Sequence, residues 1–438
     1  MLNGKVVLVT GGTGSFGHKF VERILEDCEP QKIIIYSRDE FKQDLMKKNF
    51  IAKYGVEKTK KLRFFIGDVR DKERLYRAFN GVDYVIHAAA MKQVPACEYN
   101  PFEAIKTNIN GAENIVEAAI DRKVKKVVAL STDKAVNPIN LYGVTKLVSD
   151  KLFISANAYS GEEGTIFSVV RYGNVAGSRG SVIPFFKQLL SQGETELPVT
   201  DIHMTRFWMV LDDAVDLVLK ALEESKGGET FVFKNPSFLI TELAKALNPN
   251  GTIKEVGIRE GEKIHEVMIT KDDANFTYDY GDYYVIYPNF EWWSTDKIKS
   301  GGKLIPENWD YNSGTNDWWL NAEELREKIR KELEQEYSSR VVKEEVVKID
   351  EEALRQQLRQ ELEKELKEEL EKTIRKQLKA EEKSGKNYAK LQLDFDGDNE
   401  KFDEIKKQLE SVNFLETTPM QAFNLLYELQ RKISEDVK

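Results

Sequence analysis

Side chains between residues 132 and 146 could carry out acid–base chemistry on a bound alcohol. Tyr142 and Lys146 stand in the pattern Tyr-x-x-x-Lys, at a spacing that places both on one face of a helix. A free phenol has a pKa of about 10 and is a poor base at neutral pH, but a neighbouring cation favours its charged form. Thr132, ten residues before Tyr142, can hydrogen-bond the oxygen that becomes a ketone. We therefore expect an oxidation centre with Tyr142 as its base.

The pair Asp133-Lys134 follows this threonine directly and could supply a second proton transfer. Oxidation of one carbon makes the proton on the next carbon acidic, so a base can remove that proton while an acid protonates a departing hydroxyl. For Lys134 to be this base its pKa must be lowered, which burial and nearby positive charge can provide. The alternative is a surface acid–amine pair at the end of a strand, without a catalytic role.

A glycine-rich loop at residues 11–17 predicts a dinucleotide site. The strand Val6–Thr10 runs into Gly11, Gly14 and Gly17, in the pattern G-x-x-G-x-x-G, and an amphipathic helix follows. The first glycine permits a tight turn, the second lets a phosphate approach the backbone, and the third lets helix and strand pack closely. A pyrophosphate then lies on the exposed N–H groups at the helix N-terminus.

The end of the second strand indicates which dinucleotide is preferred. An NAD site usually has an acidic side chain at this strand tip to hold the ribose 2′-hydroxyl. Here Ser37 and Arg38 occupy the tip and Lys42 follows one turn later, and these cations suit a 2′-phosphate. The pattern favours NADP, with the alternative that Asp39 takes the ribose. Asp68-Val69, after the third strand, is placed to border the adenine.

The elements that must position these residues alternate between strands and helices. Apolar, strand-like runs recur with helical stretches between them, which predicts βαβ units and a parallel sheet. They are Lys5–Thr10, Lys32–Tyr36, Arg63–Ile66, Tyr84–Ala88, Val127–Leu130 and Phe167–Arg171. The expected fold is α/β: a Rossmann-type doubly wound sheet with a smaller α/β substrate domain. We place the catalytic region at 1–338, with the dinucleotide-binding core mainly in 1–175 and the substrate-binding parts mainly in 176–338.

Composition limits the class of protein. A net charge of −9 argues against a nucleic-acid binder, and no apolar run reaches the length of about 20 residues that spans a bilayer. The two cysteines, Cys28 and Cys97, lack metal or redox spacing. The chain enters a strand at once, without a signal peptide. We therefore expect a cytoplasmic protein that has no metal and binds neither a membrane nor nucleic acid.

After Ser338 the composition changes to an all-α, charged extension. Residues 339–383 read as a charged helix, 384–398 as a linker and 399–438 as a small helical hairpin. In the charged helix, leucines recur every fourth residue from Leu354 to Leu370. Such a stripe wraps around the helix, which favours a solvated helix over a two-stranded coiled coil. The last segment weakly resembles the C-terminal helical segment of MutS-type mismatch-repair ATPases. We expect the extension to be a spacer or a self-association element that does not touch the active site.

Several strings together carry a family resemblance over about residues 3–335. They include TGGTGSFG, YSRDEFKQ, LSTDKAVNPINLYGVTK, VVRYGNVAGSRG and GIREGEKIHEVMI. The region resembles the soluble inverting UDP-N-acetylglucosamine 4,6-dehydratases of the PseB type, which are extended short-chain dehydrogenases/reductases. The resemblance implies an NADP-dependent 4,6-dehydration of UDP-N-acetylglucosamine with inversion at C5, for the synthesis of pseudaminic acid or of capsular or flagellar sugars.

The resemblance also implies roles for individual residues. Lys134 would be the catalytic base, Asp133 the acid, Tyr142 and Lys146 the oxidation pair and Thr132 a helper. The implied cofactor contacts are Gly11, Thr13, Gly14, Ser15, Phe16, Gly17, Ser37, Arg38, Asp39, Lys42, Asp68, Val69, Ala88, Lys92, Tyr142 and Lys146. The implied substrate contacts are Lys92, Lys134, Asn174, Arg206, Arg259 and Glu262.

Two further expectations accompany the resemblance. A nucleotide-sugar epimerase of the same superfamily is the alternative activity, because it shares Tyr-x-x-x-Lys but needs no acid–amine pair. The fold commonly dimerises through the helices that carry the Tyr-x-x-x-Lys segment, so the protein is expected to be a homo-oligomer.

Overall fold

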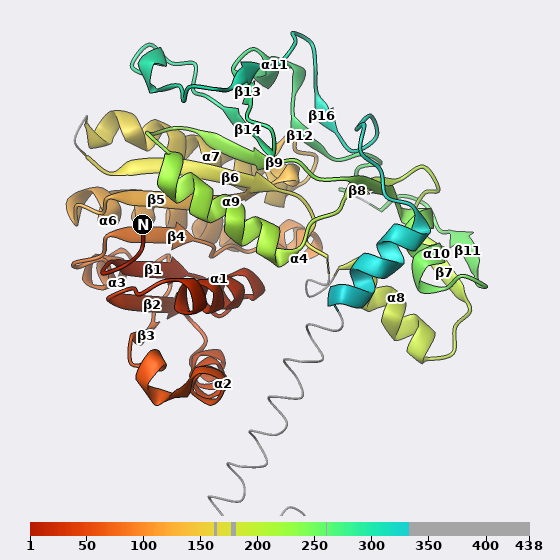
Figure 1. Cartoon of the computed structure of the whole chain (residues 1–438), viewed down its shortest axis with the longest axis horizontal. Helices are drawn as coiled ribbons and strands as arrows, with labels where there is room; N and C mark the ends of the chain where they lie inside the picture. Colours follow the sequence, from red (N-terminus) through yellow and green to blue (C-terminus); the bar gives the residue numbers. More distant parts are fainter. Residues whose placement is uncertain (162–163, 177–180, 260, 333–438) are drawn as a thin grey trace, which may run out of the picture. The chain divides into compact units, whose positions relative to one another are not determined.

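The structure is a computed structural model that describes residues 1–161, 164–176, 181–259 and 261–332 (Figure 1). The predicted charged helix at 339–383, the linker at 384–398 and the hairpin at 399–438 lie outside the described residues.

A ten-stranded sheet forms the centre of the described chain, in the order β15-β13-β14-β9-β6-β5-β4-β1-β2-β3 (Figure 1). The seven neighbouring strands β9, β6, β5, β4, β1, β2 and β3 run parallel to one another. Beyond β9, the strands β14, β13 and β15 continue the sheet in antiparallel pairs. The first six strands are β1 Val6–Thr10, β2 Lys32–Ser37, β3 Leu62–Ile66, β4 Tyr84–His87, β5 Lys126–Thr132 and β6 Ile166–Tyr172. The others are β9 Thr230–Phe233, β13 Thr277–Asp279, β14 Tyr283–Ile286 and β15 Lys303–Leu304.

The six strand runs predicted from the sequence correspond to β1–β6, which confirms the predicted parallel α/β fold. Strand order reverses between β1 and β4, and ligands of such folds bind beyond the carboxyl ends of the strands at this point. Four strands that follow residue 175 in the sequence, β9 and β13–β15, also belong to the large sheet. The chain therefore leaves the core after β6 and returns to it.

Helices cover both faces of the sheet. On one face lie α1 and α9, and on the other α3, α6 and α7 (Figure 1). The helices of this part are α1 Ser15–Asp27, α2 Glu40–Thr59, α3 Lys72–Ala78, α4 Val94–Tyr99, α5 Pro101–Ile105, α6 Gly111–Asp121, α7 Leu141–Ser160 and α9 Leu211–Glu224. A π-helical turn at Lys106–Asn110 joins α5 to α6, and a 3₁₀ turn at Asp133–Ala135 follows β5.

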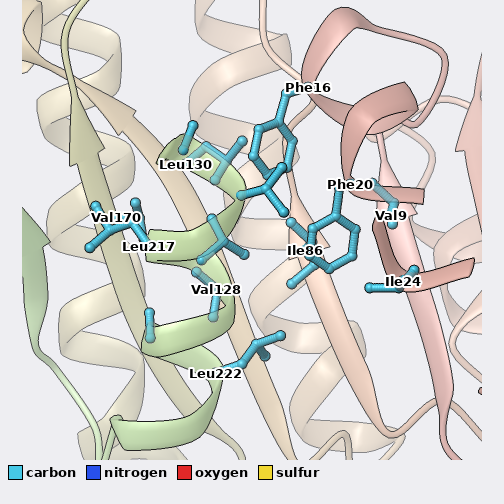
Figure 2. Close-up of a cluster of buried hydrophobic side chains, with 14 of the residues drawn as sticks. Val9, Phe16, Phe20, Ile24, Ile86, Val128, Leu130, Val170, Leu217 and Leu222 are labelled. Atoms are coloured by element: carbon cyan, nitrogen blue, oxygen red, sulfur yellow. The ribbon is translucent and has the colours of Figure 1, made fainter. Parts of the chain in front are cut away.

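The packing of α1 shows how the glycine loop is held in place. Phe16, Phe20 and Ile24 recur every fourth residue and are all buried, so one stripe of the helix faces the core. Figure 2 shows these side chains against β1, β4 and β5, with α9 closing the cluster from the side. This burial anchors the helix whose N-terminus follows the loop.

The smaller substrate-side part contains short paired strands and three helices around a core of its own. Its strands are β7 Glu196–Val199 with β11 Thr252–Glu255, β8 Thr205–Phe207 with β10 Ser237–Leu239, and β12 Val267–Ile269 with β16 Tyr311–Asn312. Its helices are α8 Val182–Ser191 and α10 Ile240–Leu247, and residues 322–332 are also helical. A short helix, α11 Lys271–Ala274, and a 3₁₀ turn, Thr295–Lys297, complete the described elements. This confirms the predicted Rossmann-type sheet with a smaller α/β part.

In the described part of the chain, none of the helices has the length and apolar character needed to cross a lipid bilayer.

Candidate active site

One cavity of about 1090 Å³ runs from the glycine loop to the substrate-side part. Its walls come from the loop after β1, the ends of β2, β3, β4 and β5, the start of α7, and β8. Apart from Asp133, every residue predicted to bind cofactor or substrate or to act in catalysis lines this cavity. The fold therefore brings together groups that are up to 251 positions apart in the sequence, between Gly11 and Glu262.

The glycine loop has the close approaches that a dinucleotide site requires. Gly11 has a φ of +64°, and a Cβ there would lie 2.9 Å from the backbone carbonyl of Ala88. A Cβ on Gly17 would lie 2.5 Å from the Cα of Gly12, so only glycine lets α1 pack this close to the loop. The N-terminus of α1, at Ser15, lines the same cavity. This arrangement fits a pyrophosphate held by backbone N–H groups.

At the tip of β2, Asp39 is the alternative ribose ligand, and its carboxylate already has partners within the protein. The Asp39 carboxylate caps α2 by accepting the backbone N–H of Lys42 at 2.9 Å, and it pairs with the Lys42 ammonium at 2.9 Å. The Arg38 side chain is 63% exposed and lies 3.6 Å from the Asp68 carboxylate. A positively charged group is thus available at the cavity rim where a 2′-phosphate would lie.

The start of α7 sets the position of Tyr142 and Lys146. Asn140 caps the helix by accepting the N–H of Gly143 at 2.8 Å, and both catalytic candidates are buried. A Cβ on Gly143 would lie only 2.1 Å from the backbone oxygen of Lys134. The glycine inside Tyr-Gly-x-x-Lys therefore allows the catalytic helix to contact the turn that carries the acid–amine pair. The sequence analysis missed this function of Gly143.

Burial and charge set the protonation of this pair in the protein alone. Burial raises the pKa of the Tyr142 phenol above its usual value, and the Asp133 carboxylate raises it further. Burial lowers the pKa of Lys146, although Asp150 acts in the opposite direction. Burial and Asp133 therefore oppose the effect expected of Lys146 in the protein alone. The phenol needs a further positive charge to ionise, such as that of an oxidised cofactor.

The acid–amine pair is not the surface pair that the sequence left open. Asp133 is 1% exposed, and its Oδ1 accepts hydrogen bonds from the Thr132 hydroxyl at 2.7 Å and from the Lys134 ammonium at 3.1 Å. Lys134 also donates to Asn174 Oδ1 at 3.0 Å. Because Thr132, Lys134 and Asn174 line the cavity and Asp133 does not, the carboxylate lies just behind the cavity wall and the amine lines it.

The charge environment of Lys134 differs from the expected one. Burial disfavours the ammonium, but the carboxylates of Asp133 and Glu266 outweigh burial and raise the pKa of Lys134. The sequence analysis expected the opposite direction, because Glu266 is 132 positions away and could not be placed beside the amine. In the protein alone, Lys134 is therefore a stable ammonium ion.

Three of the predicted substrate residues, Arg206, Arg259 and Glu262, line the cavity from the substrate-side part. Arg206 is buried on β8 and donates to the backbone oxygens of Thr205 and Ile264, at 2.7 and 3.1 Å. Arg259 is exposed on the loop after β11, and Glu262, half-buried, follows on the same loop. Together they place two guanidinium groups where a diphosphate could enter.

Asn108 is a supporting residue that the sequence analysis missed. It is buried in the π-helical turn, donates to Met91 O at 2.9 Å and to the Thr145 hydroxyl at 3.0 Å, and accepts the Met91 N–H at 2.8 Å. It thereby ties the loop after β4 to the catalytic helix. A π-helical turn inside an α-helix is rare and often marks a functional site, but the sequence carries no separate signal for one.

Within the described ranges, no group of three or more His, Cys, Asp or Glu side chains is arranged to hold a metal ion.

Comparison with known proteins places the chain among nucleotide-sugar enzymes. A family model described as "Polysaccharide biosynthesis protein" matches residues 7–288. A UDP-N-acetylglucosamine 4,6-dehydratase (inverting) from Campylobacter jejuni is 53% identical over 331 residues, which cover 74% of this chain and 97% of the relative. A UDP-glucose 4-epimerase from Rickettsia canadensis is 45% identical, covering 74% of this chain and 94% of the relative. The crystal structure of Pen from Bacillus thuringiensis superposes with a TM-score of 0.68 at 37% identity, covering 76% of this chain and 99% of Pen.

Proposed function

The chain belongs to the polysaccharide biosynthesis protein family, and we propose that it is a UDP-N-acetylglucosamine 4,6-dehydratase that inverts C5 and uses NADP. The observation that carries this proposal is the acid–amine pair, whose carboxylate is buried and whose amine lines the cavity. Asp133 and Lys134 are joined at 3.1 Å, and Thr132 links them to the oxidation site. The relative from Campylobacter jejuni with this activity aligns over nearly its whole length. An enzyme that only oxidises and reduces C4 has no use for a second proton-transfer pair.

The first step is oxidation at C4 of the sugar. Tyr142 accepts the proton of the C4 hydroxyl while Thr132 holds the oxygen through a hydrogen bond, and Lys146 supplies positive charge on the same helix face. A bound nicotinamide cofactor supplies the hydride acceptor for C4 and, at the end of the cycle, the hydride donor for C6. The resulting C4 ketone makes the C5 proton acidic.

The second step is elimination of water across C5 and C6. A proton passing from Lys134 to Asp133 along their 3.1 Å contact produces a neutral amine and a carboxylic acid without changing the net charge. Lys134 then takes the C5 proton while the C6–O bond breaks, and the departing hydroxyl takes the proton from Asp133 and leaves as water. The C5–C6 double bond is finally reduced by hydride at C6 and a proton at C5. One water is lost and the cofactor ends in its starting oxidation state.

NADP is proposed over NAD because of the tip of β2. The Asp39 carboxylate is committed to capping α2 and to Lys42, whereas Arg38 is mostly exposed at the cavity rim. A guanidinium that is 63% exposed and lies 3.6 Å from its carboxylate partner suits a 2′-phosphate better than a ribose hydroxyl. Titrating the protein with NADP⁺ and NAD⁺ tests this: equal affinity for both, or tighter binding of NAD⁺, would contradict the preference.

The proposal also covers the cellular location, the assembly and the pathway of the enzyme. We place the enzyme in a reducing cytoplasm, which fits its free cysteines, half-buried Cys28 and buried Cys97. We propose that it works as a homo-oligomer, that the segment after residue 338 adds self-association, and that the product serves pseudaminic acid or capsular or flagellar sugar synthesis. Neither a membrane nor nucleic acid is a proposed partner.

A nucleotide-sugar epimerase is the second candidate, favoured by the 45% identity to a relative named UDP-glucose 4-epimerase. Incubation with UDP-N-acetylglucosamine and NADP⁺, followed by mass spectrometry of the sugar nucleotide, separates the two activities. A dehydratase gives a product lighter by one water, and the variant Asp133→Asn should lose this product. An isomerised sugar of unchanged mass would instead establish the epimerase.

A further inference from the structure

Glu266 is a buried carboxylate at the edge of the catalytic cluster. It precedes β12 directly, is 3% exposed, and does not line the cavity. Its Oε1 lies 3.6 Å from the Lys134 ammonium and also 3.6 Å from Nε of Arg206. One oxygen thus lies between an amine and a guanidinium that both line the cavity.

The backbone of Glu266 is fixed by residues far away in the sequence. Its N–H donates to the Ser313 hydroxyl at 2.9 Å, and its carbonyl accepts the Ser313 N–H at 2.8 Å. The Ser313 hydroxyl also meets the Thr205 hydroxyl at 2.7 Å, and Thr205 meets His265 Nδ1 at 2.8 Å. All contacts of Ser313 and Thr205 are interior, since these residues are 0% and 2% exposed. These contacts fix the backbone of Glu266, and its buried carboxylate extends from there to Lys134 and Arg206.

Folding alone does not explain this arrangement. Oε2 of Glu266 is buried and has no hydrogen-bond partner, and leaving a buried carboxylate oxygen without a partner costs stability. A neutral or apolar side chain of similar size would avoid that cost. The unsatisfied oxygen indicates that the negative charge itself has a use.

Resting on the function proposed above, we propose that Glu266 is a positioning residue for Lys134, which sets the charge of the amine and balances Arg206 throughout the cycle. With all four groups ionised, the two carboxylates match the two cations. After the proton passes from Lys134 to Asp133, the remaining charges are those of Glu266 and Arg206, and these still cancel. The base can become neutral without leaving a buried charge uncompensated.

Other charged groups around Lys134 do not replace Glu266. The titratable and charged groups near the cluster are Asp133 on the turn after β5, Lys92 after β4, Tyr142 on α7, Arg206 on β8, and Lys263 and His265 on the loop before β12. Of these, only Asp133 is a carboxylate, and it is the proposed acid. Burial opposes the ammonium of Lys134, whose pKa is nevertheless raised, with Asp133 and Glu266 as the causes.

The test is the pH dependence of the elimination step in Glu266→Gln. Water loss should slow on the alkaline limb of its pH profile, where the ammonium of Lys134 is lost and Asp133 has no proton to donate. Removing a carboxylate 3.6 Å away lowers the pKa of Lys134. We expect this limb to move to lower pH by about one unit or more. The plateau rate should fall, because a weaker base accepts the C5 proton more slowly. Reduction of bound NADP⁺ by the substrate, which reports oxidation at C4, should keep its wild-type rate.

A second buried glutamate provides the control. Glu229 is 2% exposed, and its carboxylate accepts the N–H groups of Lys226 and Gly227, outside the catalytic cluster. Glu229→Gln should lower stability but leave the pH limb in place. If Glu266→Gln does not fold, Glu266→Asp serves instead, because it withdraws the charge by one methylene and should shift the limb in the same direction by less.

The outcomes separate the inference from the proposed function. If wild-type protein removes no water from UDP-N-acetylglucosamine, the proposed function is overturned and the role of Glu266 falls with it. If wild type is active but the pH limb is unchanged in the Glu266 variants, or C4 oxidation slows as much as water loss, only the inference is overturned.

Discussion

Replacing Gly143 by alanine should inactivate the enzyme while leaving it folded. The new Cβ would lie 2.1 Å from the backbone oxygen of Lys134 and 3.0 Å from the carbonyl carbon, whereas ordinary contact begins at 3.4 Å. Neither atom belongs to a flexible side chain, so the start of α7 and the turn after β5 must separate by about 1.3 Å. That displacement moves Tyr142 relative to the acid–amine pair.

The expected effects on stability and on rate differ in size. Overpacking of this kind costs about 1–3 kcal/mol, but alanine within a helix recovers about 1 kcal/mol relative to glycine. The net loss of stability should therefore stay below about 2 kcal/mol. A displacement of about 1 Å between reacting groups can lower the rate by about 100-fold, which corresponds to about 2.7 kcal/mol in the activation barrier.

The assay combines turnover of UDP-N-acetylglucosamine with thermal unfolding of the same preparations. Val144→Ala serves as the control, because the neighbouring Val144 is 42% exposed on the same helix and its truncation should change neither quantity much. A Gly143→Ala variant that retained more than about a third of the wild-type kcat would refute the argument that close approach of α7 to the Lys134 turn is required.

Three further predictions concern the support of the site, its pH dependence and its extent. Asn108→Ala should destabilise the protein by about 2–4 kcal/mol, because it leaves buried partners unsatisfied, whereas Asn110→Ala, exposed in the same turn, should cost little; equal unfolding temperatures for the two variants would contradict this. His87 is buried and its pKa is lowered from 6.5 to about 3, first by burial and then by Lys146. The unfolded chain therefore takes up a proton below about pH 6.5 that the folded chain refuses, and stability should fall by about 2 kcal/mol from pH 7 to pH 5 through this group; urea midpoints of His87→Gln should show a flatter dependence, and an unchanged slope would exclude His87 as the cause. A chain ending at Ser338 should keep the KM and kcat of the full chain, because the described residues that line the cavity end at Glu262; lost NADP⁺ binding would show that the extension reaches the site.

Short-range patterns in the sequence were sufficient for much of the fold and for the cofactor end of the site. The glycine loop after β1 and the spacing of Tyr142 and Lys146 are local, since each depends on the conformation of one turn or one helix. The apolar runs of β1, β2, β4, β5 and β6 likewise indicate burial on both faces of a parallel sheet, and each run can be recognised from its own residues. The sequence did not predict that β9 and β13–β15 pair with the main sheet. Pairing between strands that are far apart in the sequence leaves no local pattern.

The chemistry of the acid–amine pair was decided by tertiary structure. The sequence placed Asp133 beside Lys134 but predicted a lowered pKa for the amine, and the structure has it raised, because Glu266 arrives from 132 positions away. Gly143 and Asn108 likewise acquire their roles only from what packs against them. Residue identity determines which proton transfers are possible. The charge of a buried group depends on the Coulomb field of its neighbours in space, and those neighbours are set only when distant segments pack together.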